Sequence, residues 1–159
     1  MLSRVRPIWP LMTALASGAM LAAARFYFQE LLGLQPCALC LQQRQWHWAV
    51  LAVSLVLLIV LRFRPGFSRW AAALIGLVLI GSAGMGAYHV AVEQHWIIAQ
   101  CEAGDLGGLG FDPNAVLVAP SCDQIAWSLL GISMAGYNAI ISALLALASF
   151  AVALTPERK

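Results

Sequence analysis

Charge is what this sequence has least of. Only 10% of its 159 residues are charged, against about a quarter in a typical soluble domain. A soluble globule with so few charges could not cover its surface with polar groups, which excludes soluble and disordered proteins. The nine basic and seven acidic side chains give a net charge of +2 and form no basic cluster, which excludes a nucleic-acid binder. The 62% hydrophobic content and mean hydropathy of +0.82 instead indicate a small integral membrane protein.

Four long apolar runs supply the expected membrane spans. Each is close to the ~20 residues that a helix needs to cross a bilayer. None shows the alternation of a strand, so helices rather than a barrel are expected. We predict an all-α fold, a single membrane domain of four transmembrane helices at about residues 8–28, 46–61, 70–92 and 129–154, with outer loops at about 29–45 and 93–128.

The first run has a second interpretation. Arg4 and Arg6, an apolar stretch and the alanines at 22–24 resemble a cleavable signal peptide. The run is longer than the usual signal core of roughly 7–15 residues, and the aromatic residues at 26–28 continue it past the alanines. Retention of this helix is therefore favoured.

Basic residues are distributed unequally along the chain. Seven of the nine lie before the first run, between the second and third, or at the C-terminus: Arg4, Arg6, Arg62, Arg64, Arg69, Arg158 and Lys159. The two outer loops hold six of the seven acidic residues. Because cytoplasmic segments carry the excess of Lys and Arg, we expect both termini in the cytoplasm.

All four cysteines fall in the expected outer loops, Cys37 and Cys40 in the first and Cys101 and Cys122 in the second. In a bacterial topology that side is oxidising, so the even count indicates two disulfides. A four-cysteine zinc site is an alternative, but zinc ribbons supply two close pairs, whereas Cys101 and Cys122 are far apart in sequence. Purely structural disulfides stay open.

The two candidate disulfides differ in kind. Cys37–Cys40 closes a tight CxxC ring, worth on the order of 2 kcal/mol in the chain-entropy model, against on the order of 3–3.5 kcal/mol for Cys101–Cys122. A CxxC ring is a poor staple and a good redox group. Residues 42–45 form the first turn of the expected second helix, ahead of its apolar span, so Cys40 directly precedes a helix N-terminus that favours an anion, and Arg44 follows one turn later. Both features would stabilise a Cys40 thiolate.

Histidine also occurs within the apolar runs. His89 lies deep in the third expected span, where an ionisable side chain usually faces a site or a partner; an interhelical hydrogen bond explains it equally well. His47 and His95 lie at the ends of expected spans and are interpreted as ordinary boundary residues. Ser82 and Gly86 form a small-xxx-small pair, which predicts a helix contact.

Taken together, the motifs resemble the DsbB family of bacterial inner-membrane disulfide bond formation proteins. The resemblance covers essentially the whole chain and rests on PCALCLQQR at 36–44, GAYHV at 86–90, SCD at 121–123, Trp127, and LGISM at 130–134. It implies a multi-pass oxidoreductase of the bacterial inner membrane. Such a protein reoxidises a periplasmic DsbA-like thiol oxidase and passes the electrons to membrane quinone, ubiquinone or menaquinone.

The resemblance also implies roles for the cysteines. Cys101 would form the mixed disulfide with DsbA, and Cys122 would be its partner. Cys37 would then exchange with Cys122, freeing Cys40 as the thiolate that meets the quinone.

Two further residues receive roles in the same way. Arg44 would support the thiolate and the quinone, and His89 would line or assist the quinone site, with no metal implied. The competing hypothesis is a non-enzymatic four-helix membrane scaffold whose two disulfides only brace its loops. Redox cycling of the CxxC pair separates the two hypotheses.

Overall fold

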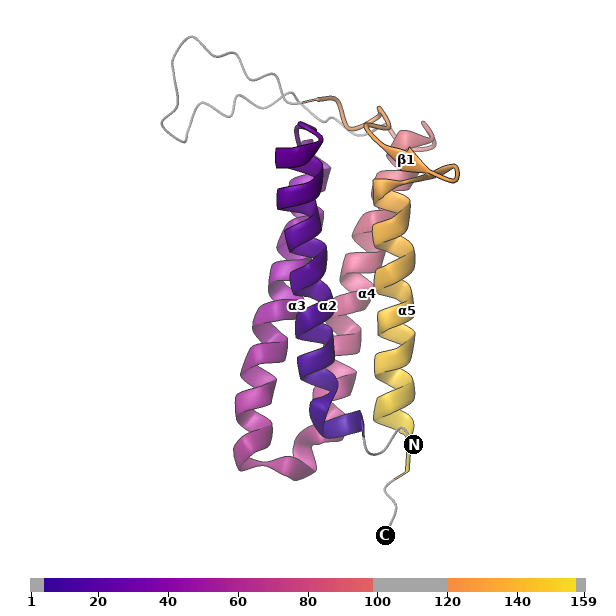
Figure 1. Ribbon diagram of the computed structural model, residues 1–159. Helices are drawn as coiled ribbons and strands as arrows, with labels where there is room; N and C mark the ends of the chain where they lie inside the picture. The colour runs from indigo at the N-terminus through magenta and orange to yellow at the C-terminus, as the bar shows by residue number, and fades with distance from the viewer. Residues whose placement is uncertain (1–4, 99–119, 157–159) are drawn as a thin grey trace.

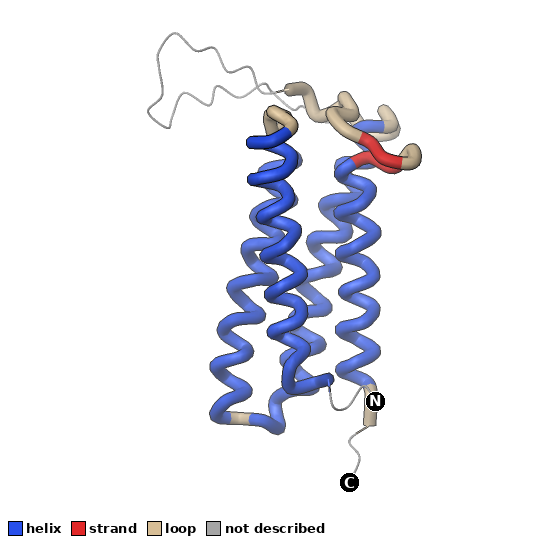
Figure 2. Tube along the Cα trace, viewed as in Figure 1, coloured by secondary structure: helices blue, strands red, loops and turns tan. Residues whose placement is uncertain are grey.

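Four long helices run side by side in the computed structural model, which describes residues 5–98 and 120–156 (Figure 1). The elements in chain order are η1 (Arg6–Ile8), α2 (Trp9–Ala22), η2 (Ala23–Leu31), α3 (Ala38–Phe63), η3 (Pro65–Phe67), α4 (Ser68–Glu93), β1 (Ser128–Leu129), β2 (Ile132–Ser133) and α5 (Met134–Leu154). Short 3₁₀ turns form η1 and η3, and η2 is a π-helix that continues α2. Helix dominates the described chain apart from one small hairpin (Figure 2).

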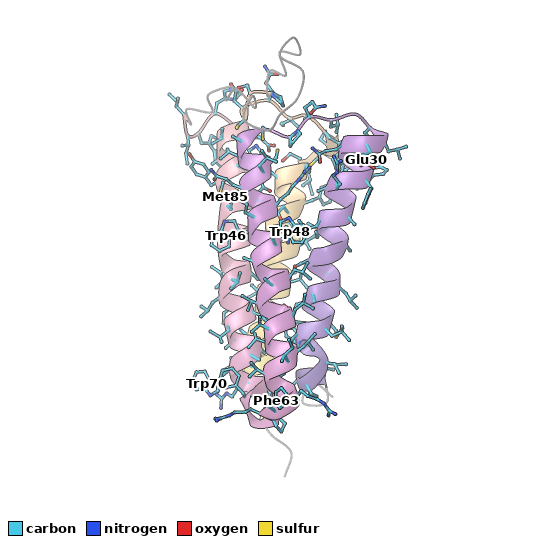
Figure 3. All side chains as sticks on the ribbon, turned by 90° about the vertical axis from the view of Figure 1, so that its left-hand side faces the viewer. Glu30, Trp46, Trp48, Phe63, Trp70 and Met85 are labelled. Carbon is cyan, nitrogen blue, oxygen red and sulfur yellow. The ribbon has the colours of Figure 1, made fainter. Side chains whose placement is uncertain are left out.

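Four stretches are long and apolar enough to cross a membrane, namely Arg6–Leu31, Ala38–Phe63, Pro65–Glu93 and Met134–Leu154. The predicted all-α architecture with four spans is therefore confirmed. Outward-facing aromatic side chains lie toward both ends of the bundle, with Phe63 and Trp70 near one end and Trp46 and Trp48 nearer the other (Figure 3). Such belts are typical of the two membrane–water interfaces.

The start of η1, the end of α5 and the α3–α4 connection lie at the same end of the bundle (Figure 1). Arg6 is buried there, and its guanidinium donates hydrogen bonds to the backbone oxygens of Val152, at 3.4 Å, and Thr155. This contact ties the start of the first span to the end of the last. The CxxC pair lies at the opposite end, as the charge distribution predicts.

Small polar side chains join the helices inside the bundle. Thr13 and Ser54 connect α2 to α3 at 2.9 Å, and the indole of Trp9 donates to Ser149 of α5 at 2.9 Å. These contacts place the first span within the bundle, which favours its retention over its loss as a signal peptide. Hydrogen bonds of this kind, with close packing, hold membrane helices together.

The predicted contact through Ser82 and Gly86 joins α4 to α5. Ser82 Oγ lies 3.0 Å from Ser142 Oγ. A Cβ atom at Gly86 would stand 2.8 Å from the backbone nitrogen of Ala139, closer than real Cβ contacts come. The glycine is therefore required by the close approach of the two helices.

We expect Gly86→Ala to destabilise the bundle by about 1–3 kcal/mol, the usual cost of overpacking. The measurement is the thermal unfolding midpoint in detergent. Gly18→Ala is the matched control, because nothing lies within 4 Å of a Cβ at Gly18. An equal midpoint for both variants would contradict the close approach.

The second span begins earlier than predicted. The sequence placed the span at about 46–61 with residues 42–45 as the first turn of its helix, whereas α3 begins at Ala38, so the expected outer loop at 29–45 is much shorter. Residues 38–45 are good helix formers, and Cys37 caps them. Their polar side chains concealed this start, because Gln43 turns inward into the bundle instead of marking a loop.

The fourth span begins later than predicted, at Met134 instead of residue 129. The intervening residues form the antiparallel hairpin β1–β2, whose two-residue turn has positive φ at Leu130 and Gly131. Glycine adopts such a turn without strain. Ser133 then caps α5 by accepting a hydrogen bond from the backbone N–H of Gly136 at 3.1 Å.

Candidate active site

Cys37 and Cys40 lie at the start of α3, at the end of the bundle away from the α3–α4 connection. Cys37 is the N-cap residue, and its sulfur accepts a hydrogen bond from the backbone N–H of Cys40 at 3.2 Å. The two sulfur atoms are 2.6 Å apart as free thiols, and a disulfide needs about 2.05 Å. The Cys37–Cys40 disulfide stays a prediction, with its two sulfurs already adjacent.

Negative charge is best stabilised on Cys37 in this pair. Hydrogen bonding from the Cys40 thiol lowers the pKa of Cys37 well below its usual range, against the opposing effect of burial, and His89 contributes in the same direction. The sequence placed the helix N-terminus, and with it the thiolate, at Cys40. That expectation is wrong about the cap: because α3 starts at Ala38, Cys37 receives the helix N-terminal N–H group.

Cys122 lies beside this pair. It is 1% exposed and forms a buried cluster with Cys37, Leu39 and Val92, against which Cys40 packs. Cys122 is disulfide-bonded. Cys101, the predicted partner of Cys122, lies outside the described residues, so the pairing of these two stays a prediction. The structure thus brings three of the four cysteines together.

His89 of α4 lies between the cysteine pair and the buried polar side chains of the bundle. Its Nε2 atom lies 3.7 Å from the Cys37 sulfur and 3.9 Å from a carboxylate oxygen of Glu93, and it interacts with the backbone of Cys122. Its Nδ1 atom accepts a hydrogen bond from the amide of Gln43 at 2.6 Å. The acceptor role of Nδ1 places the ring proton on Nε2, where it faces the Cys37 sulfur.

A chain of buried hydrogen bonds continues from Gln43 across to α5. The amide nitrogen of Asn138 donates to Gln43 Oε1 at 2.7 Å, and Asn138 Oδ1 lies 2.7 Å from His47 Nε2. All three side chains are less than a tenth exposed. From sequence no role is expected for Gln43 or Asn138, and His47 is expected to be an ordinary boundary residue. The spacing of Cys40, Gln43 and His47 on one face of a helix was the signal that could have found them.

A cavity of about 370 Å³ lies against the cysteine pair. Its lining is mostly apolar and includes one wall of aromatic rings, in which Phe28 and Trp127 meet edge to face at 5.0 Å and Trp127 lies 6.1 Å from Tyr137. Cys37 and Cys40 both line it. An apolar pocket with a few convergent polar groups is the usual form of a small-molecule site, and flat rings pack well against aromatic walls.

Arg44 also lines this cavity, one helical turn after Cys40. Its guanidinium donates to the side-chain oxygen of Gln29 at 2.7 Å and to the backbone oxygen of Ala24 at 3.1 Å. Both acceptors belong to the π-helix η2, a form that is frequent at functional sites. Arg44 therefore holds the first span against α3 while placing a positive charge beside the thiols. The candidate site residues Cys37, Cys40, Arg44 and His89 all border one cavity.

The three donor atoms of Cys37, Cys40 and His89 lie within 4.8 Å of one another, close enough to be considered as metal ligands. Two thiolates on one tetrahedral zinc ion stand about 3.8 Å apart, given Zn–S distances of about 2.3 Å. The 2.6 Å between these sulfurs is shorter and suits exchange of bonds between them. The geometry of the described residues favours a redox pair over a zinc site.

Comparison with known proteins agrees with this chemistry. The family model described as "Disulfide bond formation protein DsbB" matches residues 5–152. The chain belongs to the DsbB family. Curated relatives named "Disulfide bond formation protein B" include those of Albidiferax ferrireducens (29% identical, covering 87% of this chain and 82% of the relative), Marinobacter nauticus (31%, 79% and 79%) and Pasteurella multocida (30%, 90% and 82%). No solved structure matches the chain significantly.

Membership of the DsbB family makes this chain a multi-pass membrane oxidoreductase that functions in disulfide bond formation. The CxxC pair adjoins the buried Cys122 on one side and the apolar cavity on the other.

Proposed function

We propose that this protein is a thiol–quinone oxidoreductase that reoxidises a periplasmic DsbA-like thiol oxidase and delivers the electrons to membrane quinone. One observation carries the proposal. Cys37 belongs to the buried cluster of Cys122 and also lines the apolar cavity. The CxxC pair therefore adjoins a cysteine of the second outer loop on one side and a site for a lipid-soluble ring on the other.

The proposed electron path begins outside the membrane. The dithiol of the partner reduces the Cys101–Cys122 disulfide, through a mixed disulfide at Cys101, and is itself oxidised to a disulfide. The thiolate of Cys122 then attacks Cys37 of the Cys37–Cys40 disulfide, so that a Cys37–Cys122 bond forms and Cys40 leaves as a thiolate. Cys101 reforms its bond to Cys122, and Cys37 and Cys40 are left reduced. Two electrons and two protons have thus passed from the partner's dithiol to Cys37 and Cys40.

In the last step Cys37 and Cys40 form their disulfide again, and two electrons and two protons reduce one quinone to quinol. Quinone supplies the high-potential acceptor. It is needed because DsbA, at about −120 mV, does not yield electrons to structural disulfides below about −300 mV. Arg44 supplies positive charge beside the reacting thiols, and His89 holds a proton on Nε2 that faces Cys37. The apolar lining and aromatic wall of the cavity suit the ring of ubiquinone or menaquinone.

Turnover with purified components tests the proposal. The protein in detergent, reduced DsbA and a short-chain ubiquinone are mixed, and partner thiols and quinone absorbance are followed together. We expect one quinone to be consumed for each partner disulfide formed, over many turnovers. The non-enzymatic scaffold predicts no quinone consumption above the rate without protein, and that result would refute the proposal.

We also propose that the protein lies in the bacterial inner membrane with both termini in the cytoplasm. The support is the shared end of the bundle that holds Arg6, the end of α5 and the basic α3–α4 connection. A reporter that works only outside the cytoplasm should be active when fused after Glu30 or Asp112, and silent after Pro65 or Lys159. Activity of the fusion at Lys159 would contradict this orientation.

A further inference from the structure

His47 places a polar group in the wall of the cavity at a distance from the cysteines. It follows Cys40 by seven residues on α3, which is about 10 Å along a helix. Cys40, Arg44 and His47 have the spacing i, i+4, i+7 that puts side chains on one helix face, and all three line the same cavity. The proposed electron path uses Cys40 and Arg44 and leaves His47 without a role.

The hydrogen bonds of Asn138 determine where His47 carries its proton. The amide nitrogen of Asn138 donates to Gln43 at 2.7 Å, so the atom that Asn138 turns toward His47 is its carbonyl oxygen, 2.7 Å from Nε2. A carbonyl oxygen only accepts, and Ser142 Oγ donates to the same oxygen at 3.3 Å. His47 Nε2 therefore carries the proton, and Nδ1 of the neutral ring keeps its lone pair.

Nδ1 of His47 has no hydrogen-bond partner among the described residues, although the side chain is only 5% exposed. Burial of an unpaired polar atom costs free energy, so each such atom in a folded protein requires an explanation. His47 lines the cavity, but Nδ1 itself is covered in this structure, so a ligand in the cavity supplies the missing partner when the imidazole turns slightly toward it. Because Nδ1 is an acceptor, that partner is a donor.

We propose that His47 accepts a hydrogen bond from a ring hydroxyl of quinol and so favours the reduced product over the oxidised substrate. The inference rests on the proposed function. A quinone offers only carbonyl acceptors, whereas its quinol offers a hydroxyl donor at each end of the ring. The two protons still come from Cys37 and Cys40 and end on the two ring oxygens, so His47 neither gains nor loses a proton. Its role is to set the preference of the site for quinol over quinone.

Binding measured without turnover tests this role. The full chain with both CxxC cysteines changed to serine cannot exchange electrons, so short-chain ubiquinone and its ubiquinol can each be titrated by anaerobic equilibrium dialysis. We expect His47→Leu to weaken ubiquinol binding about tenfold, as loss of one hydrogen bond predicts, and ubiquinone binding by less than about twofold. His47→Phe, which keeps a ring without an acceptor, should do the same.

Two further variants make the result specific to the acceptor atom. His47→Gln keeps a donor for Asn138 and a carbonyl acceptor, so it should restore ubiquinol binding to within about threefold of the parent. His95→Leu removes an exposed histidine outside the cavity and should change neither affinity. Unfolding midpoints without ligand identify any variant that loses binding by losing its fold.

The outcomes distinguish the role of His47 from the proposed function. If the parent binds both ring forms and His47→Leu weakens both equally or neither, the role of His47 is wrong and the quinone site stands. If the parent binds neither form, the proposed function and the role of His47 both fail. Selective loss of ubiquinol binding, restored by His47→Gln, is the result that supports the inference.

Discussion

Cys40→Ser is expected to let each protein molecule oxidise one equivalent of DsbA and then stop. The Cys101–Cys122 disulfide can still accept two electrons from the partner. Onward transfer then fails, because Cys40 is the sulfur 2.6 Å from Cys37 and serine cannot form the disulfide that Cys122 must attack. We expect steady-state quinone reduction to fall by at least about a thousandfold, as when one member of a catalytic unit is removed. The measurement is the count of partner disulfides formed per protein molecule.

Cys101→Ser is the matched control for this prediction. It leaves the CxxC pair and the cavity unchanged but removes the proposed capture of the partner, so even the first equivalent should be absent. The proposed order of the thiols therefore predicts one DsbA disulfide formed per molecule of Cys40→Ser and none per molecule of Cys101→Ser. Continued turnover by Cys40→Ser beyond one equivalent would show that Cys122 passes its electrons elsewhere.

The membrane architecture could be predicted from sequence because the bilayer imposes a strong and local constraint. A helix that crosses it needs about 20 apolar residues, and such runs are visible without knowledge of any contact. The positive-inside rule then grouped Arg6 with Arg62, Arg64 and Arg69, and the structure places these residues at one end. The Ser82–Gly86 pair was predictable for the same reason, since small residues four apart indicate close packing.

The start of α3 was missed because hydropathy measures transfer to lipid, whereas one face of residues 38–45, with Leu39 and Gln43, is buried against protein. Gln43 and His47 are polar, yet each is less than a tenth exposed, because the bundle interior supplies hydrogen bonds to them. The partner that makes this possible, Asn138, is 95 residues from Gln43 in the sequence. No local pattern in the sequence reveals a contact of that range.

The prediction of which CxxC cysteine carries the negative charge failed for the same reason, because it depended on where α3 begins. Sequence spacing predicted a cysteine at a helix N-terminus, where a thiolate is stabilised, and the structure has one there. The residue at the N-cap depends on where the helix begins. A shift of that start by three positions moves the cap from Cys40 to Cys37. Four of the residues singled out by the family resemblance, Cys37, Cys40, Arg44 and His89, line one cavity, but the hydrogen bonds among them could be found only in the structure.

Arg44→Ala is expected to raise the quinone concentration needed for half-maximal turnover by about tenfold to a hundredfold. Arg44 is the one arginine or lysine among the described residues that line the cavity, and loss of a charged hydrogen-bond partner costs about 1–3 kcal/mol. The variant also loses the bonds to Gln29 and Ala24 that hold η2 against α3. Capture of DsbA through Cys101 should be unchanged, because it occurs outside this cavity.

Two variants separate the charge of Arg44 from its hydrogen bonds. Arg44→Lys keeps a positive charge but cannot reach both acceptors with a planar fork, so its quinone dependence should fall between the parent and Arg44→Ala. Arg25→Ala is the matched control, since Arg25 lies on the same π-helix, pairs with Glu30 at 3.2 Å in an exposed position and does not line the cavity. It should leave quinone dependence at the parent value. An unchanged quinone dependence in Arg44→Ala would remove Arg44 from the site, and the cysteines and His89 would then have to hold the ring without it.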